Sequence, residues 1–173
     1  MNSWQDKYAP QKFEELLIPL DTPLVPINYL LEQFAKTGNC MYSGFVLYGN
    51  GGTGKTAFLN FIKQTQNWHI HRITDLGAGK DEIDAIEKEI DLCSREFFKQ
   101  KVLIEANELS KSSMAFRDGL RGIIDRNRGN VFILATDNDI QKLLYDNPQL
   151  IGVRRLLAID LSLIHISEPT RPY

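Results

Sequence analysis

The sequence has few cysteines, no long apolar run and almost no net charge. Its only cysteines are Cys40 and Cys93, too few and too far apart for a disulfide framework or a metal cluster. We therefore expect ordinary thiols in a reducing compartment. No apolar run approaches the roughly 20 residues that span a bilayer, and no secretion signal opens the chain. These absences predict a cytoplasmic location and no membrane partner.

The charge balance argues against a protein that binds nucleic acid through its whole surface. Lys and Arg number 20, and Asp and Glu number 22, so the net charge is −2. Such proteins usually carry a basic excess. Any contact with nucleic acid must therefore come from a local group of basic residues.

The last residues, 161–173, read differently from the rest of the chain. They begin Leu-Ser-Leu-Ile-His-Ile-Ser-Glu-Pro-Thr-Arg, which resembles the translation of a transposase-based sequencing-library adaptor. We therefore exclude them from the fold and expect one natural domain over residues 1–160. The exclusion removes one acid and one base, so the net charge stays at −2. The alternative is a genuine C-terminal segment, because Ser-Glu-Pro-Thr-Arg-Pro also suits an ordinary loop.

A phosphate-loop motif directly follows the apolar run 45–48. Its residues are Gly49, Asn50, Gly51, Gly52, Thr53, Gly54, Lys55 and Thr56. Glycines let backbone N–H groups turn inward around a triphosphate. Lys55 would reach the β- and γ-phosphates, and the Thr56 hydroxyl would bind Mg²⁺. Residues 55–66 have apolar side chains at helical spacing, so the loop should end at a helix N-terminus aimed at the phosphates. The motif predicts a site for ATP and Mg²⁺.

Apolar runs and helical patterns alternate along the chain. Three runs, residues 45–48, 101–104 and 131–136, show little alternation of apolar and polar residues, as expected of parallel strands covered on both faces. We expect two further strands at residues 68–73 and 155–159. Residues 81–93 and 112–126 have the spacing of amphipathic helices. This order predicts an α/β doubly wound domain with a parallel sheet and flanking helices.

Two histidines share one side of the expected strand 68–73. His69 and His71 could be metal ligands, but the sequence offers no third ligand nearby. Structural or surface roles are therefore favoured for both.

The N-terminal segment carries a family resemblance. Residues 4–16 read Trp-Gln-Asp-Lys-Tyr-Ala-Pro-Gln-Lys-Phe-Glu-Glu-Leu. They resemble the W-x-x-K-Y-R-P-x-x-F-x-E-L segment of the AAA+ ATPase subunits of sliding-clamp loaders, which include replication factor C small subunits and their bacterial and phage counterparts. In that family the segment lies against the adenine, which implies a nucleotide contact for Tyr8. Ala9 stands where the family has Arg, so any contact made by that Arg is absent.

The resemblance covers residues 3–160 and implies further parts of the protein. A P-loop AAA+ domain is followed in the family by a helical lid with a sensor arginine and by an oligomerising collar. We expect these parts to follow Asp160, so that this chain lacks them. The implied location is the cytoplasm of a bacterium or of a phage-infected host.

The acids after the run 101–104 depart from the family's D-E-A-D motif, and three registers stay open. Matching Glu105-Ala106-Asn107 to E-A-D puts Ile104 at the magnesium position. Matching strand ends makes Glu105 the magnesium acid and puts Ala106 at the catalytic position. A third register matches Asn107-Glu108 to Asp-Glu. The resemblance implies Glu105 as a metal ligand and Glu108 as general base; the alternative is a pair of solvated acids.

Two later segments also resemble functional parts of the family. Residues 131–138 look like the sensor-1 strand, whose terminal polar residue reads the γ-phosphate; Asn138 or Asp137 would carry that role. Arg154 lies where the family has an arginine finger that acts on the neighbouring subunit's ATP. An ordinary pair of surface arginines, Arg154 and Arg155, is the alternative.

Clamp loaders grip primed DNA through basic residues on inward-facing helices. The corresponding residues here are Lys111, Arg117, Arg121 and Arg126. Arg117 and Arg121 are one helical turn apart and could meet successive phosphates. A solvated helix face is the alternative, because Asp118 and Asp125 dilute the patch.

The first functional hypothesis is an ATPase subunit that works with other clamp-loader subunits, a sliding clamp and primed DNA. The second is a structural subunit of the same complex that does not hydrolyse ATP, which the altered acids favour. A third is another replication AAA+ protein, such as a helicase loader.

Overall fold

A computed structural model describes residues 24–38, 40–73, 79–95 and 100–161. Its helices are α2 (Leu24–Thr37), α3 (Lys55–Thr65), α4 (Lys80–Ser94), α5 (Met114–Arg126) and α6 (Ile140–Asp146). The strands are β1 (Gly44–Tyr48), β2 (His69–Arg72), β3 (Val102–Ala106), β4 (Val131–Asp137) and β5 (Leu156–Asp160). Two short 3₁₀ helices follow β3 and α6, η2 (Leu109–Lys111) and η3 (Pro148–Leu150).

The five strands form one parallel sheet in the order β2-β3-β4-β1-β5. Every predicted strand is present, so the prediction of an α/β chain with a parallel sheet and flanking helices is confirmed. β3 and β4 extend further than expected, to Ala106 and Asp137. Helices α2 and α6 were not predicted; α6 has only 7 residues, too few for a clear apolar period.

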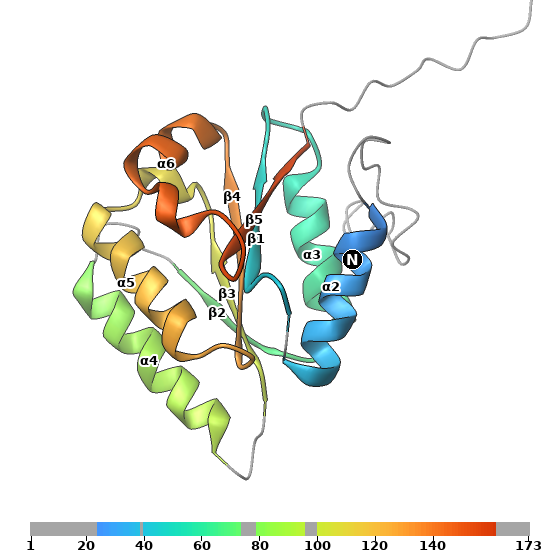
Figure 1. Ribbon diagram of the computed structural model, residues 1–173, viewed down its shortest axis with the longest axis vertical. Helices are drawn as coiled ribbons and strands as arrows, with labels where there is room; N and C mark the ends of the chain where they lie inside the picture. The colour runs from blue at the N-terminus through green and yellow to red at the C-terminus, as the bar shows by residue number, and fades with distance from the viewer. Residues whose placement is uncertain (1–23, 39, 74–78, 96–99, 162–173) are drawn as a thin grey trace, which may run out of the picture.

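Helices cover both faces of the sheet. Helices α2 and α3 lie on one face, and α4, α5 and α6 lie on the other (Figure 1). Successive strand residues point to opposite faces, so Phe45 and Leu47 join the α2–α3 side and Val46 joins the other. All seven residues of β4 are buried, which explains the absence of polar alternation in its sequence.

An aromatic cluster fills the core between the sheet and α2. The Phe132 ring of β4 lies 5.0 Å from the ring of Phe34, 5.1 Å from that of Phe45 and 5.5 Å from that of Trp68. Phe132 is fully buried. The cluster ties α2, β1, β4 and the start of β2 together.

The backbone pairing of β5 with β1 continues to Leu161, which the sequence analysis excluded from the fold. Leu161, the first residue of the segment that resembles an adaptor product, is 2% exposed, and its N–H donates to the Tyr48 carbonyl at 2.8 Å. Residues 162–173 lie outside the described residues. None of the helices in the described ranges has the length and apolar character needed to cross a membrane.

We predict that Phe132→Ala lowers the free energy of unfolding by about 3–5 kcal/mol, because it removes a ring from a closed cluster and leaves a cavity. Urea denaturation followed by circular dichroism measures the loss. The control is Tyr145→Ala on α6, where the side chain is 88% exposed; we expect a change within about 0.5 kcal/mol. Equal losses for the two variants would contradict this account of the core.

Candidate functional site

The phosphate loop lies at the carboxyl edge of the sheet, between β1 and α3. β1 leads into α3 on one face, whereas its neighbour β4 leads into α6 on the other (Figure 1). Open parallel sheets bind ligands where consecutive connections leave to opposite faces, because a crevice forms there. The loop and the residues after β3 and β4 meet at this crevice.

The loop's glycines adopt backbone conformations that other residues avoid. Gly49, Gly52 and Gly54 have φ values of 141°, 82° and 88°, in the region that favours glycine. A Cβ atom added at Gly51, Gly52 or Gly54 would have no other group within 4 Å. The loop is therefore concave and open, so a ligand can approach its backbone directly.

The start of α3 supplies donors for an anion. The first intrahelical bond after the loop runs from the Phe58 N–H to the Gly54 carbonyl, at 3.0 Å. The N–H groups of residues 55–57 therefore have no acceptor within the helix. The first turn of α3 contains no acidic side chain. Both features suit a phosphate group at this helix end.

Lys55 folds back over the loop. Its Nζ donates to the carbonyl oxygens of Gly49 and, at 2.8 Å, Asn50. Burial lowers the pKa of Lys55, and the carboxylates of Asp137 and Glu108 oppose this effect. A bound phosphate would offer the Lys55 ammonium group charged oxygens in place of the neutral Gly49 and Asn50 carbonyls. Charged acceptors form stronger hydrogen bonds with an ammonium group.

A cavity of about 680 Å³ opens in front of the loop, within the usual range for small-molecule sites. It brings together most of the predicted site residues with five further polar side chains. The predicted ones are residues 51–56, Glu105, Glu108 and Asn138, and the further polar ones are Asn60, Lys63, Arg72, Asn107 and Thr136. Of these five, Asn107 appears in the registers left open for the strand-end acids. Tyr8 lies outside the described residues.

Glu105 projects into this cavity from a buried position. Its side chain is 5% exposed, and its Oε2 atom lies 3.0 Å from the Lys63 Nζ. Its Oε1 atom lies 3.8 Å from the Arg72 Nε and accepts a hydrogen bond from the Asn107 Nδ2 at 3.5 Å. The carboxylate thus has a cation near each oxygen. A metal ion that binds this carboxylate would compete with these partners.

Glu108 has a different environment. Its backbone is left-handed, with φ of 54°, a conformation that costs energy in a non-glycine residue. Its Oε1 atom accepts from the Asn138 Nδ2 at 3.2 Å, and its Oε2 atom accepts from the Lys111 Nζ at 2.7 Å. The loops after β3 and β4 therefore meet through Glu108 and Asn138. Ile104 and Ala106, on either side of Glu105 in β3, are fully buried and do not line the cavity.

Of the two candidates at the end of β4, only Asn138 lines the cavity. Asp137 is 2% exposed. Its carboxylate accepts from the Ser110 N–H at 2.6 Å, from the Ser110 hydroxyl at 2.8 Å and from two following N–H groups. Asp137 therefore holds the loops together, and Asn138 is the one of the two whose side chain lies at the cavity.

Arg117 is wrongly predicted as a DNA contact. It is 4% exposed, and its guanidinium group donates to the Ser110 and Ser112 carbonyls at 3.1 and 2.8 Å. It also donates to the Asn147 Oδ1 at 2.6 Å and pairs with Asp146 at 3.3 Å. Helical spacing placed Arg117 beside Arg121, but the packing of α6 covers the turn that carries Arg117.

The other three basic residues also have partners. Lys111 pairs with Glu108, which lines the cavity in front of the loop, Arg121 donates to Gln149, and Arg126 pairs with Glu87. Contact with DNA stays a prediction for these three residues.

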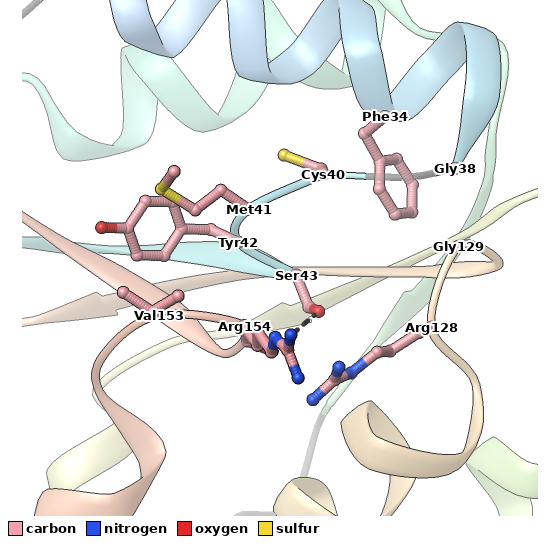
Figure 2. A pocket seen from close by; sticks show the side chains of 10 residues that line it. All are labelled: Phe34, Gly38, Cys40, Met41, Tyr42, Ser43, Arg128, Gly129, Val153 and Arg154. Atoms are coloured by element: carbon pink, nitrogen blue, oxygen red, sulfur yellow. Dashed lines mark hydrogen bonds between the residues drawn. The ribbon is translucent and has the colours of Figure 1, made fainter.

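Arg154 lies at the opposite, amino edge of the sheet. A cavity of about 530 Å³ is lined there by residues 40–43, which precede β1, and by Arg128, Val153 and Arg154. Figure 2 shows the Arg154 and Arg128 side chains turned toward the same space beside Ser43. Arg154 therefore lies away from the phosphate loop of its own chain.

The two histidines of β2 contact acids of α4. Glu89 Oε2 lies 3.1 Å from the His69 Nε2 and 2.8 Å from the His71 Nδ1, and His71 Nε2 lies 3.2 Å from Glu82. Within the described residues, no group of three or more His, Cys, Asp or Glu side chains could hold a metal ion. The expected structural role of these histidines agrees with this arrangement.

In comparisons with known proteins, no family model and no curated protein matches this chain. The site must therefore be interpreted from its own geometry.

We predict that Arg117→Ala lowers the free energy of unfolding by about 3–5 kcal/mol, because it leaves Asp146, Asn147 and two carbonyls without their buried partner. The matched control is Arg121→Ala, four residues later on α5, with an expected change within about 0.5 kcal/mol. Urea denaturation of both variants measures the difference. A loss for Arg117→Ala no larger than for the control would contradict a structural role for Arg117.

Proposed function

We propose that this chain binds ATP with Mg²⁺ and hydrolyses it as an AAA+ subunit of a sliding-clamp loader. The observation that carries the nucleotide proposal is the open glycine loop, which leads into the free N–H groups of α3 and faces a polar cavity. Triphosphates need such a concave set of donors, because several phosphate oxygens must be met at once.

The cavity also offers groups for each step of phosphate chemistry. Lys55 would exchange the Gly49 and Asn50 carbonyls for β- and γ-phosphate oxygens. The Thr56 hydroxyl would hold Mg²⁺, which neutralises charge on the phosphates when bound. Glu105, expected from the resemblance as a second ligand, lies at the same cavity but is paired with Lys63. Glu108 would accept the proton of the attacking water as general base, and Asn138, hydrogen-bonded to Glu108, would position that water.

Three features support the clamp-loader part of the proposal. Residues 4–16 resemble the family's adenine-side segment, and Asn138 follows β4 at the sensor-1 position. Arg154 lies at the edge away from its own loop, where a finger that acts on a neighbouring subunit must lie. In this proposal the partners are other clamp-loader subunits, a sliding clamp and primed DNA.

A structural subunit that binds ATP without hydrolysing it is the second candidate. Two observations favour it: Ala106 is buried at the strand end where one register puts the catalytic glutamate, and Glu105 is held by Lys63.

We predict that Lys55→Ala weakens ATP binding at least about tenfold, because the loop loses its phosphate-binding ammonium group. Isothermal titration calorimetry with ATP and Mg²⁺ measures the affinity. Lys88→Ala, at an exposed position of α4, is the control and should bind as the unchanged chain does. Unaltered affinity in Lys55→Ala would remove the basis of the nucleotide proposal.

We predict that Glu108→Gln lowers turnover about 100-fold while ATP affinity stays within about threefold, because an amide cannot accept the proton but keeps the contact with Asn138. A phosphate-release assay, run with a sliding clamp and primed DNA, measures turnover. Turnover unaffected by Glu108→Gln contradicts its role as base. Tight ATP binding with no turnover in the unchanged chain favours the structural subunit instead.

A further inference from the structure

The contact between Lys63 and Glu105 lies inside the candidate nucleotide cavity. The side chains come from α3 and the end of β3, and the Lys63 Nζ lies 3.0 Å from the Glu105 Oε2. Their side-chain exposures are 23% and 5%, so water screens this pair less than a surface pair. Both residues line the cavity.

Lys63 is too far along α3 to act on the phosphate loop. It follows Lys55 by eight residues, which is about 12 Å along the helix axis. Lys55 covers the loop carbonyls, whereas Lys63 reaches the end of β3. The same helix thus delivers one ammonium group to the phosphate site and another to the strand-end acid.

The remaining oxygen of Glu105 is also engaged. Arg72 stands directly opposite Glu105 in the β2–β3 ladder, and its Nε lies 3.8 Å from Oε1. Asn107 donates to the same oxygen at 3.5 Å. A divalent cation that approached Glu105 would meet a carboxylate whose charge two cations already balance, and it would be repelled by both.

We propose that Lys63 is a positioning residue that holds the Glu105 carboxylate in an ion pair and keeps it off the Mg²⁺ ion. This inference rests on the proposed nucleotide function and refines it, since Glu105 then serves as the partner of Lys63 and Arg72. In this arrangement the Thr56 hydroxyl would be the ligand that this chain offers to Mg²⁺, and the ion would neutralise charge on the phosphates when bound. Magnesium therefore adds little to ATP affinity in this chain.

The test compares ATP affinity in excess Mg²⁺ with ATP affinity in EDTA, by isothermal titration calorimetry on the whole chain. We expect the two affinities of the unchanged chain to differ by less than about threefold. In Lys63→Met the freed carboxylate becomes available, and the ratio should rise to about tenfold or more. The double variant Lys63→Met with Glu105→Gln should show the same ratio as the unchanged chain, because the effect of magnesium in Lys63→Met depends on the Glu105 carboxylate.

Two further variants control for general effects. Lys63→Arg keeps the ion pair and should keep the small ratio. Lys36→Met removes an exposed helical lysine that pairs with Glu32 at 3.1 Å, far from the cavity in sequence, and should also leave the ratio unchanged. A general loss of folding would lower ATP affinity in Mg²⁺ and in EDTA alike, and would leave their ratio unchanged.

If Lys63→Met does not fold, Glu105→Gln by itself still tests whether Glu105 contributes to the effect of magnesium on ATP affinity. The proposal expects no change in the ratio, because the carboxylate is not on the metal. A ratio above about tenfold in the unchanged chain that falls in Glu105→Gln would overturn the role of Lys63 and leave the nucleotide function standing. No ATP binding in either condition would overturn the proposed function itself, and this inference with it.

Discussion

The rest of the structure depends on the backbone pairing of β1, an interior strand of the sheet. β1 is hydrogen-bonded to β4 on one side and to β5 on the other, with Tyr48 level with both Asp137 and Asp160. The approach to β4 is so close that a Cβ atom on Gly44 would lie 2.0 Å from the Ile133 carbonyl oxygen. This register aligns the strand ends, so that the phosphate loop opens beside the residues after β3 and β4.

Charge pairing organises the cavity that forms at this edge. Lys63 and Arg72 balance Glu105, while Lys111 and Asn138 contact Glu108. No buried side-chain nitrogen or oxygen atom of the described residues lacks a hydrogen-bond partner. A polar cavity is stable only under that condition, since an unpaired buried group costs about 1–3 kcal/mol. A ligand that enters must therefore compete with these side-chain contacts, whereas the N–H groups of residues 55–57 have no acceptor within α3.

Two polar residues show why a role cannot be assigned from spacing alone. Arg117 has the spacing of a surface contact, and Asp137 stands at a strand end beside Asn138. In the folded chain, Arg117 joins α5 to α6, and Asp137 fastens the loops after β3 and β4. Both are buried, because elements that the sequence did not predict, α6 and η2, pack over them.

The sequence by itself determined the parallel strands, the helices α3, α4 and α5, and the phosphate loop, because local periodicity and glycine chemistry depend only on neighbouring residues. Only the tertiary structure decided which distant side chains meet. It put Asn138 at the cavity and buried Asp137, brought Lys63 and Arg72 to Glu105, and put Arg154 at the far edge. These outcomes depend on strand order and register, which arise from long-range backbone pairing and carry no local signal in the sequence.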